Sequence, residues 1–244
     1  MVKQRSRKDV LEDRFLITGD TREDVSREVD RDSLMEPKHL EEFLEWYVRD
    51  MECPDRHTAA SRFHFHMMRP MLRGPIFTLS IRNEVINWGP EQFLYQKHKN
   101  GEEGHEWGAK LSPLHVESIE KGDRKKARSA VYKQVFAGHF EPIFQSMKQI
   151  TTIPLRTLWE NLAHVLMVYV PKWNKEANGS STRNRLESDL DYLCSATIKD
   201  WENQLSEPLK DLQTQLRNRG YFERTTCCLN YRLERYCESC PLTD

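Results

Sequence analysis

The feature that most restricts how this chain can fold is a long apolar stripe with helical spacing, which ends just before Pro171. Its residues recur at intervals of three and four, so they lie on one face of an α-helix. They are Leu155, Leu158, Trp159, Leu162, Val165, Leu166 and Tyr169. Pro154 stands near the expected start of this helix, where proline is tolerated, and Pro171 is expected to stop it. The stripe predicts a mainly helical core.

The same spacing predicts two helices earlier in the chain. The first begins at Glu36 and carries apolar residues as far as Met51. The second covers residues 59–71, and we expect Pro70 and Gly74-Pro75 to kink or end it.

Two further helical regions are expected on either side of the apolar stripe. One carries apolar residues from Val131 to Met147, and Pro142 should kink it or split it in two. The other runs from Leu186 to Leu216 as one or two helices, interrupted near Pro208 and ended by Gly220.

A change of pattern near residues 85–111 predicts a small sheet. The segments VINW (Val85–Trp88) and QFLYQ (Gln92–Gln96) are short and rich in β-branched and aromatic residues, and HEWGAKL follows the turn-like KNGEEG. We expect an antiparallel hairpin or meander. The fold class is therefore α+β and predominantly helical, with a helical body, a small antiparallel sheet and an irregular C-terminal metal-binding segment.

The expected organisation along the chain has three parts. Residues 1–35 are dense in Arg, Asp and Glu, which indicates a charged N-terminal arm, either a surface helix or partly disordered. Residues 36–220 form the mainly helical body with the short β-meander. Residues 221–244 form the metal-binding segment.

Composition excludes several classes of function. The 244 residues carry 37 basic and 38 acidic side chains, a net charge of −1, so no basic excess favours nucleic-acid binding. The N-terminus is charged from its third residue and lacks the apolar core of a signal peptide. The longest apolar run, Val165–Val170, is far shorter than the roughly 20 residues of a membrane helix. We expect a soluble, cytoplasmic protein that does not span a membrane.

Four of the six cysteines lie within 14 residues, in the order CC-x8-C-x2-C: Cys227, Cys228, Cys237 and Cys240. A reducing cytoplasm disfavours disulfides, so these thiols are expected to be metal ligands or redox groups. Thiolates suit zinc, copper(I) and iron–sulfur clusters. Structural zinc sites usually separate both ligand pairs by two to four residues, and the adjacent pair departs from that pattern. Spacing alone leaves iron–sulfur and zinc open.

Three stretches resemble the FhuF-type ferric-siderophore reductases. The tail RTTCCLNYRLERYCESCPL is similar to the C-terminal signature of that family, which carries a [2Fe–2S] cluster on CC-x10-C-x2-C. This chain has eight residues where the family has ten. Upstream, ASRFHFHMMRPMLRGPIFTLSI resembles the family's segment before its short sheet. The stretch GHFEPIFQSMKQITTIPLRTLWENLAHVLMVY resembles the family's HLEPL…LWGN-like helical region. The likeness runs from about Ala59 to the end.

The resemblance implies a function and a ligand set. Cys227, Cys228, Cys237 and Cys240 would hold a [2Fe–2S] cluster that passes one electron to chelated Fe(III) and so releases Fe(II) in the cytoplasm. The substrate would be a ferric siderophore, of the hydroxamate type usual in the family. A zinc knot in a noncatalytic binding module and a cluster-based redox or iron sensor are the alternatives.

Other residues receive more modest predictions. Arg224 and Arg232 are candidate contacts for a chelate, only because they lie near the cysteines. The chain lacks both common glycine-rich phosphate loops, so we expect electrons from a separate ferredoxin or reductase, not from bound NAD(P)H, flavin or ATP. The remaining candidates are expected to pack or hydrogen-bond within the fold, at the surface or in the core. They are His64, His66, His139, His164, Cys53, Cys194, Trp107 and Trp159.

Overall fold

The structure is a computed structural model, and it describes most but not all of the chain. The described residues are 6–20, 23–67, 69–88, 93–99, 106–120, 122–194, 224–233, 236–237 and 240–242. The predicted helical region beyond Cys194, including Pro208 and Gly220, lies outside the described residues.

Helices account for most of the described chain. The α-helices are α1 (Arg7–Phe15), α2 (Pro37–Asp50), α3 (Arg56–Met67), α4 (Arg69–Phe77), α5 (Arg124–Tyr132), α6 (Glu141–Ile150), α7 (Leu155–Glu176) and α8 (Ser180–Cys194). The π-helical segments η2 (Thr78–Arg82) and η4 (Lys133–Phe140) continue α4 and α5, and η1 (Ser33–Met35) and η5 (Asn230–Leu233) are short 3-10 helices. The strands are β1 (Ile17–Thr18), β2 (Val25–Asp30), β3 (Glu84–Asn87), β4 (Phe93–His98), β5 (Glu106–Leu111) and β6 (His115–Ser118).

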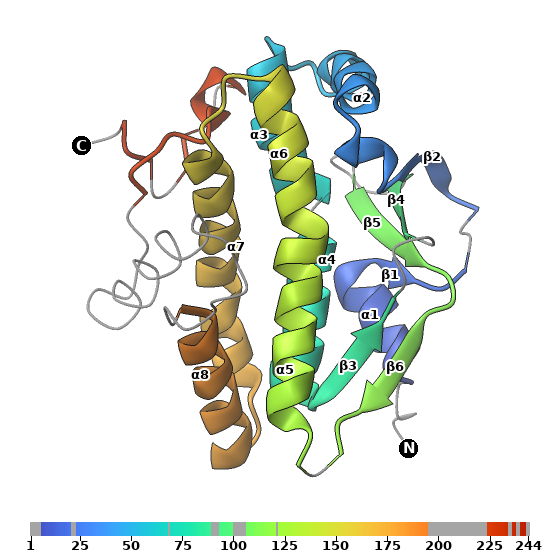
Figure 1. Ribbon diagram of the computed structural model, residues 1–244, viewed down its shortest axis with the longest axis vertical. Coiled ribbons are helices and arrows are strands. Elements are labelled where there is room, and N and C mark those ends of the chain that lie inside the picture. Colours follow the sequence, from blue (N-terminus) through green and yellow to red (C-terminus); the bar gives the residue numbers. More distant parts are fainter. Residues whose placement is uncertain are drawn as a thin grey trace.

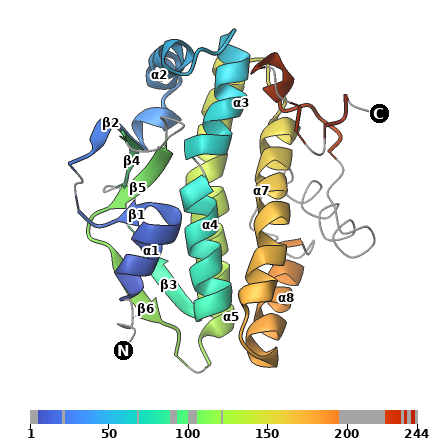
Figure 2. The ribbon, with the colours of Figure 1, turned by 180° about the vertical axis from the view of Figure 1, so that it is seen from behind.

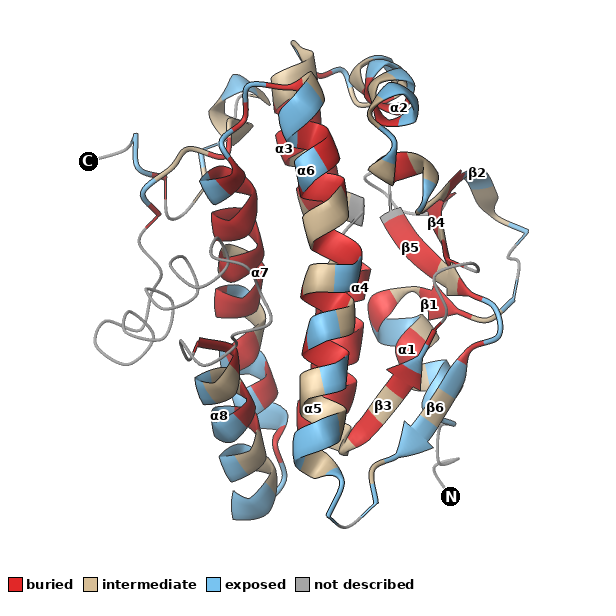
Figure 3. Cartoon of the chain, in the orientation of Figure 1, coloured by how far each residue is buried: buried red, intermediate tan, exposed pale blue. Residues whose placement is uncertain are grey.

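The helices form a bundle with the strands on one side of it. The column of α3 and α4, the column of α5 and α6, and α7 run side by side along the long axis of the molecule (Figures 1 and 2). The faces where these helices meet are buried, whereas β6 and the outer face of α8 are exposed (Figure 3). This arrangement confirms the predicted class, α+β and predominantly helical.

The sheet is mixed and is divided into two parts. Strands β4 and β5 form the expected antiparallel hairpin, but β1 joins β5 in parallel and β2 joins β4, giving the order β1-β5-β4-β2. Strand β3 pairs with β6, not with β4 as a single meander would require. The expectation of one antiparallel meander is therefore wrong, because strands from outside residues 85–111 complete both sheets.

The N-terminal region also differs from its prediction. The residues expected to form a separate charged arm fold into α1, β1 and β2. Leu11, Phe15 and Ile17 are at most 2 % exposed, and the Phe15 ring packs 5.2 Å from that of Phe77. A few well-spaced apolar residues thus dock this region despite its high charge, because burial of their surface offsets the ordering entropy.

Two prolines fail to end their helices. Pro75 lies inside α4, and the preceding Gly74 lets this helix approach β1 so closely that an added Cβ would lie 2.3 Å from Ile17 Cδ1. Pro171 lies inside α7, which continues to Glu176. Buried Trp173 packs against Phe77 one turn later, so tertiary packing outweighs the backbone hydrogen bond that proline cannot donate. Pro142 lies near the start of α6, but the backbone is helical through Phe140 and Glu141, so Pro142 does not split the region in two.

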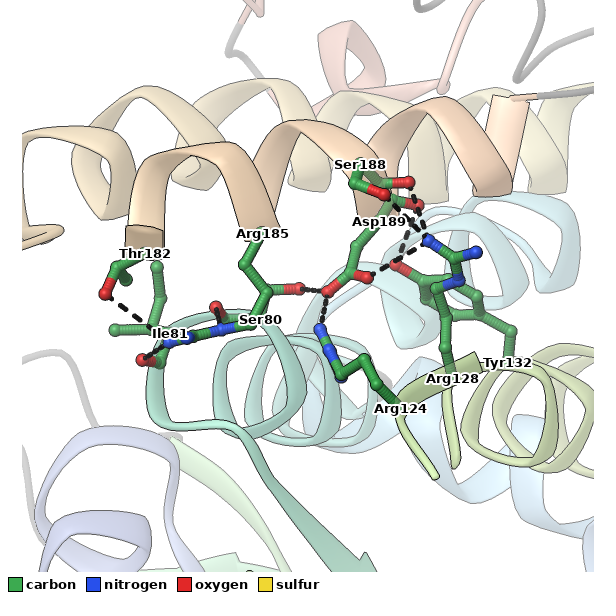
Figure 4. A network of polar contacts seen from close by, with 9 residues as sticks. All are labelled: Ser80, Ile81, Arg124, Arg128, Tyr132, Thr182, Arg185, Ser188 and Asp189. Carbon is green, nitrogen blue, oxygen red and sulfur yellow. Dashed lines mark hydrogen bonds and ion pairs between the residues drawn. The ribbon is translucent and has the colours of Figure 1, made fainter. Parts of the chain in front are cut away.

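A polar network fixes α8 to the bundle (Figure 4). The buried carboxylate of Asp189 accepts a hydrogen bond from Ser80 Oγ at 2.7 Å and forms an ion pair with Arg124. Arg185 donates to the carbonyl oxygens of Ser80 at 2.9 Å and of Ile81 at 2.7 Å. These contacts satisfy carbonyl groups in the π-helical segment η2 and hold α8 against it.

Candidate metal centre

The cysteine segment, residues 224–242, lies at one end of the bundle against α3 and α7 (Figures 1 and 2). Its described part is irregular apart from η5, as the sequence predicts. Such a segment has few backbone hydrogen bonds of its own, so its position depends on side chains of the helices beneath it.

Glu160 of α7 is the principal anchor of the segment. Its side chain is 2 % exposed, and it accepts the backbone N–H groups of Thr225 at 3.1 Å and Thr226 at 2.8 Å. It also accepts both threonine hydroxyls, and the Arg156 guanidinium at 2.9 Å. Burial alone would raise the pKa of Glu160, but the hydrogen bonds from Thr225, Thr226 and Arg156 outweigh it and lower the pKa. The anchor is therefore an ionised carboxylate.

A second anchor joins α3, α7 and the segment. Ser61 Oγ donates to the carbonyl oxygen of Cys228 at 2.5 Å and accepts Asn161 Nδ2 at 3.3 Å. Asn161 Oδ1 in turn accepts the guanidinium of Arg224, whose Nε donates to the Thr226 carbonyl at 3.2 Å. Buried polar groups of α3 and α7 thus hold the chain in place just before and at the adjacent cysteines.

The structure brings two of the four predicted thiol ligands into direct contact. The sulfur atoms of Cys228 and Cys237 lie 3.8 Å apart. Two thiolates on one tetrahedral metal ion, with bonds of about 2.3 Å, would be about 3.8 Å apart. Cys227 and Cys237 are half-buried, and Cys228 and Cys240 are buried. The separation of Cys228 from Cys237 is therefore suited to binding one metal ion.

The backbone around the cysteines supports the sulfur atoms. Leu229 has a positive φ of 61°, so the chain turns sharply after the adjacent cysteines and the Leu229 N–H donates to Cys227 Sγ at 3.3 Å. The N–H of Cys240 donates to the Cys237 carbonyl at 3.1 Å, which closes the turn of the CxxC unit. An N–H donor to sulfur stabilises a thiolate and is a common way to adjust a metal–thiolate centre.

The thiols of Cys227 and Cys237 have raised pKa values. Burial, followed by the neighbouring Cys228 thiol, raises the pKa of Cys237 to about 12. Burial is also the main cause that raises the pKa of Cys227, against the opposing Leu229 N–H. The Arg224 guanidinium opposes both shifts. Crowded thiols of this kind lose their protons most readily when a bound cation neutralises the thiolates, because metal binding displaces protons from its ligands.

The four cysteines do not surround a single point. In the part of the chain that the structure describes, no three Cys, His, Asp or Glu side chains form a group that could hold one metal ion. The chemistry of the donor set still fits a two-iron cluster, which takes four thiolates and needs only two of them on each iron. Cys228 and Cys237 form one such pair, and Cys227 and Cys240 are the remaining thiols.

The two predicted chelate contacts differ in position. Arg224 is 3 % exposed and lies beneath the cysteines, where its Nη1 has no hydrogen-bond partner among the described residues. Arg232 lies at the surface and pairs with Asp55. Arg224 thus serves the docking of the segment, and the predicted contact of either arginine with a chelate stays a prediction.

Two hollows adjoin the cysteines and share no residue. The first has a volume of about 250 Å³, and its wall includes Cys228, Cys237, Arg62, Arg69 and His164. The second, of about 220 Å³, lies beside Cys227 and is lined by His57, Leu229 and the residues that lead into α7. The sulfur atoms are therefore accessible from two directions.

The residues that the sequence analysis considered packed are mostly packed. Trp107, Trp159, Cys53 and Cys194 are buried. His139 is buried with its Nε2 2.5 Å from the Tyr95 hydroxyl, as expected for a histidine with a partner.

Two histidines of α3, His64 and His66, have different surroundings. His64 is buried against the Phe144 ring at 5.1 Å, and its two ring nitrogens have no hydrogen-bond partner among the described residues. Burial, reinforced by Arg224 and Arg69, lowers the pKa of His64 to about 3, so this histidine is neutral. His66 lines the hollow beside Cys228.

Sequence reasoning missed the anchors Glu160, Asn161 and Ser61. The available signal was the adjacent polar pair Glu160-Asn161 in the middle of an apolar helix, next to Trp159. Buried polar groups need partners, so such a pair indicates a second segment docked at that point.

One family model matches more than half of the chain. Its description is "Ferric iron reductase FhuF-like transporter", and the match covers residues 87–239, which includes Cys227, Cys228 and Cys237. No curated protein matches the chain. Among the described residues, no helix has the length and apolar character needed to cross a membrane.

Proposed function

Because the chain belongs to the FhuF-like ferric iron reductase family, we propose that it reduces a ferric siderophore by one electron and releases Fe(II) in the cytoplasm. In this proposal Cys227, Cys228, Cys237 and Cys240 hold a [2Fe–2S] cluster. The observation that carries the proposal is the 3.8 Å contact between Cys228 and Cys237 in a segment held by buried polar anchors.

The protein's own residues would prepare the site in three ways. Glu160 and Ser61 fix the backbone that carries the adjacent cysteines. The Leu229 N–H donates to Cys227 Sγ, and the guanidinium of Arg224 lies beneath the thiols with one unused N–H group. Both donors favour the thiolate form and offset negative charge, which raises the reduction potential of an iron–sulfur centre. When bound, an all-cysteine [2Fe–2S] cluster of the plant type supplies one electron at about −400 mV.

The chemistry of the substrate explains why one electron is enough. Hydroxamate and carboxylate oxygens are hard ligands, and they hold the small, highly charged Fe(III) ion tightly. Fe(II) attracts the same oxygens less strongly, because its charge is lower. Reduction therefore loosens the complex. The half-exposed positions of Cys227 and Cys237 support the close approach that electron transfer to a bulky chelate requires.

A structural zinc knot is less well supported. A single zinc ion needs four ligands around one point. The described cysteines form no group of three around one point, whereas a cluster with two irons needs ligands only in pairs.

The experiment that tests the proposal is a visible absorption spectrum of the anaerobically purified protein, with iron, sulfide and zinc quantified on the same sample. We expect about two irons and two sulfides per chain, bleaching by dithionite, and recolouring by a ferric trihydroxamate. Colourless protein with zinc would overturn the reductase and favour the knot.

Serine variants test the ligand set. Each of Cys227, Cys228, Cys237 and Cys240 changed to serine should lose or alter the visible spectrum. Cys53→Ser is the matched control, since Cys53 is a buried cysteine outside the segment, and it should leave the spectrum unchanged. An unchanged spectrum in all four ligand variants would contradict the assignment.

A further inference from the structure

The hollow beside Cys228 and Cys237 has a strongly basic wall. We name it the Arg62–Arg69 pocket; its lining comprises Arg62, Phe65, His66, Arg69, His164, Asn230 and the two cysteines. Arg62, His66 and Arg69 recur at intervals of four and three across α3 and the start of α4, so they lie along one face of this helical column. Among the residues that the structure describes, the lining includes no acidic side chain.

The two arginines lack the carboxylate partners that surface arginines of this protein commonly have. Neither Arg62 nor Arg69 makes an ion pair within the described part of the chain. Arg62 donates a hydrogen bond to Asn230 Oδ1 at 3.3 Å, and the Nε atoms of both arginines are buried with no hydrogen-bond partner among the described residues. Arg14, Arg56, Arg124 and Arg232 provide the contrast, because each is paired with an acidic side chain.

The two positive charges are also close enough to repel each other. Burial lowers the pKa of the Arg69 guanidinium, and Arg62 lowers it further, against the opposing effect of Tyr169. His164 does not add to the charge at neutral pH, since burial followed by Arg224 and Arg69 lowers its pKa to about 4. The pocket therefore holds two like charges, and the described part of its lining supplies no counter-charge.

The basic wall continues away from the cysteines. His66 and Arg69 also line an adjoining hollow of about 100 Å³, together with Arg73 and Arg14. Arg73 lies over the Tyr169 ring at 3.7 Å, which keeps its guanidinium along the same side of the helical column. A ligand with more than one negative group could thus extend from the cysteines along this wall.

From these observations we propose that the Arg62–Arg69 pocket binds a negatively charged arm of the ferric chelate, such as a free carboxylate. The inference rests on the proposed function and specifies its substrate class: anionic chelates are preferred over neutral ones of the same size. Guanidinium groups bind carboxylates through two parallel hydrogen bonds, and such charge-assisted bonds are among the strongest that proteins make.

The size of the pocket determines how much of the chelate it can hold. A volume of about 250 Å³ is below the range of pockets that enclose a drug-sized ligand. The pocket can accept one arm, and the bulk of the complex would remain outside. Binding the arm at Arg62 and Arg69 would bring the chelated iron toward Cys228 and Cys237, which line the same pocket.

The test measures binding separately from reduction. The probes are two gallium(III) trihydroxamate complexes, one with a pendant carboxylate and one with that carboxylate converted to an amide. Gallium(III) replaces iron because it is not reduced under these conditions. Affinities are measured by titration calorimetry on the cluster-containing protein. We expect the wild type to bind the carboxylate complex about tenfold more tightly than the amide, which corresponds to about 1.4 kcal/mol.

Matched variants show which residues cause the preference for the carboxylate complex. Arg62→Gln and Arg69→Gln should each abolish most of it, whereas Arg69→Lys should retain part of it because the positive charge remains. Arg183→Gln is the control: Arg183 is exposed on α8, at the opposite end of the bundle from the cysteines, and its loss should leave the tenfold preference intact (Figure 1). The visible spectrum and the midpoint of thermal unfolding show whether each variant is folded.

The possible outcomes separate this inference from the proposed function. Equal affinity of the wild type for both complexes, in protein that carries the cluster and reduces a ferric trihydroxamate, would overturn the anionic preference alone. A preference that survives both glutamine variants would overturn the assignment to this pocket. Protein without an iron–sulfur spectrum that still shows the Arg62- and Arg69-dependent preference would overturn the reductase and support the ligand class.

Discussion

Asp189 in α8 and Glu160 in α7 are both buried carboxylates that hold a segment against the bundle, but their donors differ in kind. Asp189 accepts hydrogen bonds from side chains of the helical body, Ser80 and Arg124, and forms an ion pair with Arg128. Glu160 accepts backbone N–H groups and hydroxyls of the irregular cysteine segment. The first carboxylate joins regular elements, whereas the second orders a segment with little regular structure.

The pKa shifts of the two carboxylates have opposite signs. At Asp189 burial dominates and raises the pKa, although Arg124, Ser80 and Arg128 oppose it. At Glu160 burial is the largest single cause, but the combined hydrogen bonds outweigh it and lower the pKa. Docking of the cysteine segment therefore favours the charged form of Glu160. Because Asp189 holds elements of the body and Glu160 holds the cysteine segment, we predict that the two regions open separately.

The largest expected effect concerns the body. Asp189→Ala removes the buried negative charge that pairs with Arg124 and Arg128. We therefore expect the free energy of unfolding to fall by about 3–5 kcal/mol. Urea denaturation followed by circular dichroism measures this change. Glu187→Ala is the control on the same helix, because Glu187 is exposed, and its effect should stay within about 0.5 kcal/mol. A loss below about 1 kcal/mol for Asp189→Ala would show that the network does not stabilise the body.

The next effect should be confined to the cysteine segment. Glu160→Ala leaves the N–H groups of Thr225 and Thr226 without their acceptor, at a cost of about 1–3 kcal/mol. Hydrogen exchange of peptides within residues 224–242 should accelerate about tenfold or more. The urea midpoint of the body should change little, and Glu176→Ala, in the exposed last turn of the same helix, should leave exchange in the segment unchanged. A drop in body stability as large as that of Asp189→Ala would contradict separate opening.

Sequence reasoning predicted the features that depend on nearby residues and missed those that depend on residues far away in the sequence. The apolar stripe of α7 and the clustered cysteines are local patterns, and both predicted their regions correctly as a helix and an irregular segment. Pro171 failed as a stop signal because Trp173 is held by Phe77, which lies far away in the sequence. Glu160 was missed for the same reason, since its partners are 65 and 66 residues away. Long-range partners decide these features, and no local pattern identifies them.

A smaller effect depends on pH and tests the direction assigned to the pKa shift of Glu160. The pKa of folded Glu160 lies below the ordinary value of 4.5, so its contribution is fully present above pH 4.5 and is lost as the pH falls through the folded pKa. Protonated Glu160 resembles glutamine. The difference in hydrogen exchange within residues 224–242 between wild type and Glu160→Gln should therefore be largest above pH 4.5 and should close at lower pH. Exchange rates are corrected for the intrinsic pH dependence of each peptide. A difference that grows on acidification would reverse the assigned sign.

The smallest expected effects come from a matched pair of serines, both fully buried. Ser80 Oγ donates to Asp189 at 2.7 Å, and Ser61 Oγ donates to the Cys228 carbonyl at 2.5 Å. Ser80→Ala removes one hydrogen bond, whereas Ser61→Ala removes the bond to Cys228 and the weaker one accepted from Asn161 Nδ2, with each bond worth about 1 kcal/mol. Ser80→Ala should lower the urea midpoint without changing exchange in residues 224–242. Ser61→Ala should accelerate that exchange and should lower the urea midpoint less than Ser80→Ala does, through the 3.3 Å bond from Asn161 alone. If both variants lower the urea midpoint equally, the cysteine segment unfolds with the body as one cooperative unit, because a bond in a separately opening segment adds nothing to the stability of the rest.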